Sequence, residues 1–130
     1  MAGQGKNGIS IYFRYHIMNI HRGAINAIGK PKYIHLLINR QEKKMFIQGC
    51  EQDRDAFKVY YAFSGQNHNV DQCHIRSKWF IEYFADMLGV AYDSESLCFS
   101  GILLEDGRTI QIDLNQYEVI AYQPEQEGAS

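Results

Sequence analysis

Basic side chains are unevenly distributed along this chain of 130 residues. Residues 1–48 contain eight lysines and arginines but a single carboxylate, Glu42, and so carry a formal charge of +7. The remaining residues contain five basic and fourteen acidic side chains, a charge of −9. Lysine and arginine supply most of the affinity of proteins for nucleic acids by neutralising phosphates. The asymmetry therefore indicates either an anionic partner for the first part of the chain or mutual neutralisation within one fold or dimer.

The basic residues that would contact DNA surround an expected helix and hairpin in the first part of the chain. They are Arg14, Arg22, Lys30, Lys32, Arg40, Lys43 and Lys44, and they would line one face if the hairpin folded over the start of the helix. Tyr12, Tyr15 and His16 lie among them, where they would contact sugars or bases. The isoelectric point of 6.2 is low for an independent DNA-binding domain, so a merely solvated basic surface is the competing interpretation.

Metal and catalytic chemistry are not predicted. Cys73 and His74, with Cys50 or His68, are the nitrogen and sulfur ligands that zinc would use. No ligand pair with a spacing of two to four residues is repeated, so we expect neither a metal nor another cofactor. A nucleophile needs a base within hydrogen-bond reach. The chain has no GxSxG, Walker A or GxGxxG motif, and we do not expect an enzyme.

The composition predicts a single domain that spans residues 1–130. Nine tyrosines and seven phenylalanines favour strands. No apolar run reaches the roughly 20 residues of a membrane span, and MAGQGKNG lacks the apolar core of a secretory signal. Three cysteines with no CxxC spacing favour a reducing compartment. We therefore expect a cytoplasmic protein without a membrane partner.

The first part of the chain predicts a strand, a short helix and a hairpin. Residues 9–18 are rich in β-forming side chains and predict one extended segment. Apolar residues recur at helical spacing over residues 20–28, and Gly29 before Lys30-Pro31 is a stop signal. Residues 33–39 and 44–49 predict a hairpin.

The second part predicts the same order of elements. Residues 57–63 predict a strand and residues 64–72 a polar loop. A short strand at 73–76 leads to a helix with Ser77 as the N-cap and Gly89 at the end. Its apolar stripe is Phe80, Tyr83, Phe84, Met87 and Leu88.

A second hairpin follows this helix. Ile102 and Leu104 precede its turn, and Ile110, Ile112 and Leu114 follow the turn. Asp106-Gly107 predicts a tight type I′ turn. Residues 117–122 predict a last strand. The chain thus has two β-α-β-β pseudo-repeats, at about 9–50 and 57–122, with loose ends at 1–8 and 123–130. The fold class expected is α+β, a small sheet or a swapped-hairpin barrel.

The segment IMNIHRGAINAIGKPKYIHLLINRQEKKMFIQ resembles the swapped-hairpin unit of the SpoVT/AbrB family, with Ile20, Ala24, Ile28 and Gly29 at the matching places. Two such units in one chain resemble the tandem MraZ subgroup. The resemblance implies a homo-oligomeric transcription regulator or antitoxin that binds double-stranded DNA with basic residues of the first unit. It adds Arg76 and Lys78, at the comparable place of the second unit, to the DNA-binding residues.

The aromatic residues of the second helix leave an alternative open. Trp79, Phe80, Tyr83 and Phe84 have the spacing of a core-facing stripe, but tryptophan and tyrosine are also enriched in interface hot spots. Adjacent Trp79 and Phe80 cannot both point to the core, so one of them would reach an interface. The alternative function is a protein-interaction module without DNA binding.

Overall fold

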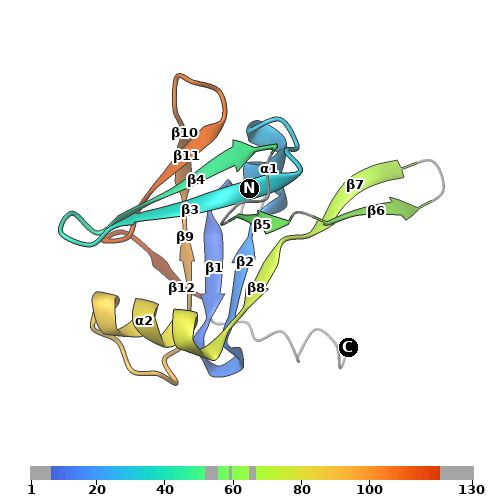
Figure 1. Ribbon diagram of the computed structural model, residues 1–130. Helices are drawn as coiled ribbons and strands as arrows, with labels where there is room; N and C mark the ends of the chain where they lie inside the picture. The colour runs from blue at the N-terminus through green and yellow to red at the C-terminus, as the bar shows by residue number, and fades with distance from the viewer. Residues whose placement is uncertain (1–6, 52–55, 59, 65–66, 121–130) are drawn as a thin grey trace.

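Two five-stranded antiparallel sheets form most of the structure, a computed structural model that describes residues 7–51, 56–58, 60–64 and 67–120 (Figure 1). Of residues 58, 60–64 and 67–72 only the backbone is described. The first sheet has the order β12 (Glu118–Ile120), β9 (Ser96–Phe99), β1 (Ile9–Tyr12), β2 (Ile17–Ile20) and β8 (His74–Arg76). The second has the order β10 (Gly101–Leu103), β11 (Thr109–Asp113), β4 (Lys44–Cys50), β3 (Tyr33–Asn39) and β5 (Phe57–Lys58).

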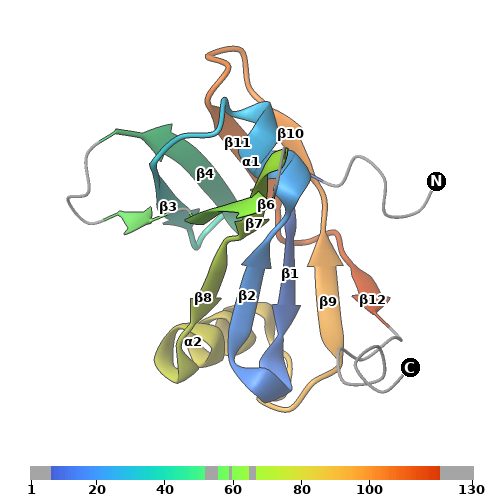
Figure 2. The ribbon, with the colours of Figure 1, turned by 90° about the vertical axis from the view of Figure 1, so that its right-hand side faces the viewer.

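The remaining elements lie at the margins of the two sheets. The 3-10 helix η1 (Phe13–Tyr15) joins β1 to β2, and α1 (Arg22–Ala27) joins β2 to β3. Helix α2 (Lys78–Leu88) follows β8, while β6 (Tyr60–Ser64) and β7 (Asn67–Gln72) form a separate hairpin (Figures 1 and 2). The prediction of a strand-rich α+β fold is confirmed.

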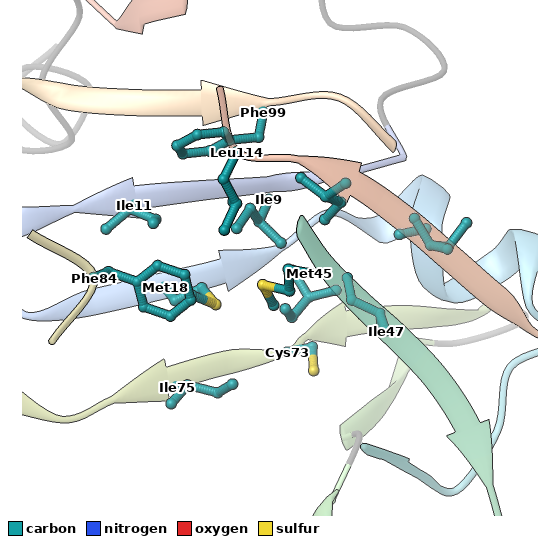
Figure 3. Packing of buried hydrophobic residues seen from close by; sticks show 14 of the residues in the cluster. Ile9, Ile11, Met18, Met45, Ile47, Cys73, Ile75, Phe84, Phe99 and Leu114 are labelled. Carbon is teal, nitrogen blue, oxygen red and sulfur yellow. The ribbon is translucent and has the colours of Figure 1, made fainter. Parts of the chain in front are cut away.

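The core lies between the inner faces of the two sheets, whose strands cross one another (Figure 1). Leu97, Ile11 and Met18 are paired across β9, β1 and β2, and their side chains are buried. Met45 and Ile47 of β4 face them from the second sheet (Figure 3). Side chains alternate between the faces of a strand, so the period-two pattern of each strand fixes which residues reach this core.

The predicted single extended segment over residues 9–18 is wrong. After β1 the chain makes the 3-10 turn η1, and His16 adopts a positive φ of 58°. It then returns as β2, with Ile9 paired to Ile20. A uniform run of β-forming residues carries no signal for a reversal that a non-glycine residue makes in the left-handed region.

The predicted ends of the helices agree with the structure. Gly29 and Gly89 have φ angles of 88° and 75°, the left-handed conformation that glycine adopts without steric cost. The side chain of Ser77 accepts a hydrogen bond from the backbone N–H of Phe80 at 3.1 Å, which makes Ser77 the N-cap of α2.

The two hairpins differ in how well they follow the prediction. The first spans 33–39 and 44–50, as expected within one residue. In the second the type I′ turn is wrong, because Gly107 has a positive φ of 73° and Asp106 does not. The amide of Gly107 donates to the carbonyl of Leu104, and that of Leu104 to the carbonyl of Thr109. The result is a turn over residues 104–107 that ends at the left-handed Gly107, within a loop of four residues, 105–108, and not of two.

Two other predictions of irregular chain need correction. The polar loop over 64–72 is wrong, because residues 67–72 form β7, which pairs with β6. Polar composition does not by itself prevent a strand. The loose end over 1–8 is wrong at its last two residues: the N–H of Gly8 donates to His21, and the Asn7 side chain accepts from the N–H of Gly101. Residues 1–6 and 121–130 lie outside the described residues.

Gly101 marks the point where the chain passes from one sheet to the other. Strand β9 ends at Phe99 in the first sheet, and β10 begins at Gly101 in the second. A Cβ atom on Gly101 would overlap the Ile110 side chain and the backbone oxygen of Asn7. Only glycine allows this close approach, so Gly101 lets one stretch of chain serve both sheets.

Replacing Ser77 by alanine tests the N-cap of α2. The Ser77→Ala change removes an acceptor for an otherwise unpaired helix N–H, so it should lower the free energy of unfolding by about 1 kcal/mol. For a domain of this size that corresponds to a fall in melting temperature of about 4 °C. Thermal denaturation followed by circular dichroism measures it. Ser100→Ala, at an exposed serine, is the control and should leave the melting temperature unchanged.

Asp106 makes the second hairpin sensitive to acid. A hydrogen bond from the Thr109 hydroxyl, helped by the N–H of Arg108, lowers the pKa of Asp106. The stabilisation is therefore present above the unfolded-state pKa and is lost as the pH falls through the folded-state pKa. The difference in melting temperature between wild type and Asp106→Asn should shrink over that acid range. A difference between the two proteins that stays constant over that range would contradict the assignment.

Candidate nucleic-acid interface

The structure separates the predicted DNA-binding residues into three groups. The α1 group is Arg22, Lys30 and Lys32, the turn group is Arg40, Lys43 and Lys44, and the α2 group is Arg14, Arg76 and Lys78. The side chains of Lys43 and Lys44 are half-buried and the other seven are exposed. A DNA backbone could contact these groups along one continuous surface only if the groups lie next to one another.

The α1 group and the turn group lie at opposite ends of β3. Lys30 and Lys32 precede the strand and Arg40 follows it. Seven residues of strand span about 23 Å, and Figure 1 shows α1 and the β3–β4 turn far apart. The hairpin does not fold over the start of the first helix, so the expectation of a single basic face built from the first unit is not met.

The turn group instead meets helix α2. The guanidinium carbon of Arg40 lies 5.3 Å from the centre of the Tyr83 ring, a cation–π contact. The Lys43 carbonyl accepts a hydrogen bond from the N–H of Leu114, which fixes the turn against the end of β11. Lys44 pairs loosely with Glu42, at 3.9 Å on an exposed surface, so its charge is only partly offset.

The α2 group surrounds the start of the same helix. Arg76 ends β8 opposite Ile17, and Lys78 is the first residue of α2. The N–H of Ser77 donates to the carbonyl of His16, which brings η1 alongside this helix end. On η1, the Nε of Arg14 donates to the carbonyl of Asp93. Basic side chains from three separate segments therefore border α2, and we call this region the α2 surface.

Aromatic rings connect the α2 surface to the core. Phe84 is fully buried, and the rings of Phe80 and Tyr83 meet it edge to face, with centroids 5.1 and 6.0 Å away. The Trp79 ring stacks on Tyr83, at 5.9 Å and 12° between planes, yet the residue is 74% exposed. The predicted stripe thus divides: Phe84 is core, Phe80 and Tyr83 are half-buried, and Trp79 points to solvent.

Two carboxylates share helix α2 with these groups. Asp86 accepts hydrogen bonds from the hydroxyl of Tyr92 at 3.0 and 3.2 Å, and this bond raises the pKa of Tyr92. Glu82 is half-buried one turn after Lys78. The carboxylates lie toward the middle and end of the helix, so the cationic part of the α2 surface is its beginning.

A buried serine–histidine pair elsewhere was not recognised from the sequence. Ser10 Oγ lies 2.8 Å from His21 Nε2, and His21 Nδ1 accepts a hydrogen bond from the N–H of Gly8 at 3.1 Å. Because Nδ1 accepts, the proton is on Nε2 and is donated to Ser10. In this form the imidazole cannot take the serine proton, as general-base catalysis would require. Ser10 in β1 and His21 at the start of α1 are eleven residues apart in the sequence, and this spacing did not indicate that they would be paired.

The structure has a cavity of about 350 Å³ where the end of β9 meets β11 and β12. Cys98, Ile102, Asp113, Tyr117 and Glu118 line part of it. The Sγ of Cys98 lies 4.0 Å from His21 Nε2. None of the predicted DNA-binding residues lines this cavity, so it is separate from the basic groups.

The zinc ligands considered from the sequence do not gather in the part of the chain that the structure describes. There, no three histidine, cysteine or carboxylate side chains approach closely enough to hold a metal. The side chain of His68 lies outside the described residues. Among the described helices, none has the length and apolar character needed to cross a membrane.

Comparisons with known proteins were made at the level of families, sequences and structures. No family model, curated protein or solved structure matches the chain. The arrangement of charged and aromatic side chains is what bears on function.

The three cysteines should differ sharply in reactivity. Burial raises the pKa of the Cys73 thiol to about 12, so at pH 8 its thiolate is about a thousand times scarcer than at the ordinary value near 9. Cys50 and Cys98 are half-exposed. Iodoacetamide should alkylate these two in the folded protein and leave Cys73 unmodified until denaturant is added, as peptide mass spectrometry would show. Rapid labelling of Cys73 in the native protein would contradict the packing around it.

Proposed function

We propose that the protein binds double-stranded DNA through the α2 surface and acts as a transcription regulator or antitoxin-like protein. The observation that carries the proposal is the contact between Arg40 and Tyr83. It joins the turn group, from the basic first part of the chain, to the α2 group. Four of the nine predicted basic residues, Arg14, Arg40, Arg76 and Lys78, then border one helix, and Lys43 and Lys44 follow Arg40 in the turn group. The first turn of α2 contains no acidic residue, and the carboxylates of the helix, Glu82 and Asp86, follow it.

The proposed mechanism is equilibrium binding. Lys78, Arg76 and Arg14 neutralise phosphates at the start of α2, and Lys43 and Lys44 do so beside the turn. Polar side chains between them, such as Gln41 in the exposed turn, supply contacts to base edges. The α1 group lies outside this surface.

Strand pairing supports the proposed pseudo-repeat and with it the resemblance to the SpoVT/AbrB family. In the proposed correspondence β2, α1 and β4 match β8, α2 and β11. Strand β2 pairs antiparallel with β8, and β4 pairs antiparallel with β11. A local two-fold axis between two copies of a unit generates this kind of pairing between equivalent strands. The matching of β3 is looser, because its counterpart is divided between β9 and β10.

Self-association and a cytoplasmic location belong to the same proposal. Leu37 and Ile102 are 49% and 64% exposed and lie in one row across the outer face of the second sheet, with Phe46 and Gln111 between them. An exposed apolar row of this kind is suited to a homo-oligomer contact. Three free cysteines support a reducing cytoplasm.

The second candidate function is a protein-interaction module without DNA binding. The same exposed row, together with the exposure of Trp79, favours it. The two functions differ in their response to salt: binding that neutralises phosphates weakens steeply with salt, and an apolar contact does not.

A paired charge-reversal experiment tests DNA binding and locates it. Arg76→Glu with Lys78→Glu should lower the affinity for duplex DNA at least tenfold. It should also reduce the salt slope by about 1.8, because each phosphate contact contributes about 0.9. Glutamate at the first residue of α2 suits the helix dipole, so the variant should fold. Fluorescence anisotropy across a salt titration measures both quantities.

The matched control is Arg22→Glu with Lys32→Glu. It makes the same change in net charge, and Arg22 is likewise the first residue of a helix. It should leave the affinity within about twofold. Equal losses from both pairs would contradict a site centred on α2, and absence of salt-sensitive binding by the folded wild type would favour the interaction module.

A further inference from the structure

The side chain of Trp79 is largely exposed to solvent beside the basic residues of the α2 surface. It is 74% exposed, the largest exposed fraction among the large hydrophobic residues that the structure describes. Burial of an apolar side chain stabilises a fold, so a tryptophan with only a structural role would be expected to be buried. Its neighbours Arg76 and Lys78 are exposed cations. An anionic ligand with a flat aromatic group matches both features.

Neighbouring aromatic rings hold the Trp79 ring in place. Trp79 stacks on Tyr83, the ring of Tyr83 packs edge to face on Phe84, and Phe84 is fully buried. Arg40 lies over Tyr83 from the turn group. A ligand that stacks on Trp79 therefore meets a platform already ordered by the core, and little side-chain entropy is lost on binding.

The stacking on Tyr83 also decides how DNA would be contacted. An intercalating side chain is inserted between two base pairs and needs both of its faces free. The rings of Tyr83 and Phe80 both stack nearly parallel to the Trp79 ring, with centroids 5.9 and 6.5 Å away, so the indole is already partly covered and has room for at most one further ring. In an intact duplex every internal base is already stacked on both sides. The partner of Trp79 must therefore be a base with a free face, which an unpaired base in a single strand can expose.

We propose that Trp79 stacks on an unpaired base and that the protein prefers DNA in which a duplex continues into a single strand. The inference rests on the proposed function, because the basic residues of the α2 surface hold the phosphates on either side of that base. Stacking of a base on an aromatic side chain is sequence-tolerant, since every base has a π face. The contact thus selects a DNA structure, while other residues read sequence.

The carboxylates of α2 set the position of the base along the helix. Asp86, two turns after Trp79, accepts from Tyr92, and Glu82 lies between them. Both repel phosphates, whereas Arg76 and Lys78 attract them at the start of the helix. The strand therefore crosses α2 at its first turn and does not run along its length.

Trp79 is the single tryptophan of the chain, so its fluorescence reports the contact directly. Three probes share one duplex: a blunt form, a form with a three-nucleotide single-stranded extension, and the extended form with abasic sites in place of those three bases. We expect about tenfold tighter binding of the extended probe than of the blunt one, within the range for stacking of one base. Trp79 emission should be quenched by the extended probe and not by the abasic one.

Variants at position 79 separate this contact from the binding of phosphates. Trp79→Ala should bind blunt and extended probes equally while it keeps the salt slope of the wild type, and Trp79→Tyr should retain part of the preference. The side chain is exposed, so both variants should fold. Salt-sensitive binding of all three probes with equal affinity and without quenching would overturn the inference and leave the proposed function standing. Failure to bind any probe would overturn both.

Discussion

The two sheets must bury their inner faces against each other, and this shared burial is the constraint on which the rest of the structure depends. Ile11 in β1 is an example. It pairs with Leu97 and Met18 within its own sheet, and it belongs to the same buried core as Met45 of the other sheet. No strand of the first sheet lies close in sequence to all its neighbours. The core therefore holds distant segments together, and the surface groups inherit their positions from it.

The α2 surface is an outcome of that constraint. Helix α2 buries Ile81 and Phe84 in the core, which turns Trp79 outward at the N-terminal end of the helix. The pairing of β3 with β4 carries the turn group toward the same helix, where Arg40 meets Tyr83. Neither half of the chain has this surface alone: cations from the first part and aromatic rings from the second part meet because both are packed on one core.

The sequence predicted best those features that are fixed by neighbouring residues. Ser77 and Gly89 mark the ends of α2 because capping is local, and the apolar alternation of 33–39 and 44–49 predicts a hairpin for the same reason. The turn at His16 was not predictable, since a non-glycine residue there adopts a positive φ under the control of distant pairing. The strand β7 was missed because its polar residues follow no alternation.

The candidate site was predicted in its residues and not in its arrangement. Arg40, Arg76 and Lys78 were correctly expected to be exposed cations, but the sequence favoured a grouping of Arg40 with Arg22. The length of β3 separates those two, and a contact across 43 residues, from Arg40 to Tyr83, joins Arg40 to α2 instead. Spacing along the chain reports neighbours on one helix or strand; it carries no information about which turn meets which helix.

Strand β1 is synthesised before the other strands that the structure describes, yet it is the central strand of its sheet, between β2 and β9. Strand β2 can pair with it early, but the other side of β1 stays open until Phe99 has been synthesised. Partners this distant along a chain slow folding. The open edge of β1 is a place where a nascent chain is vulnerable to pairing with another copy. The first sheet, and with it the surface around α2, is therefore completed only after β12 has been synthesised.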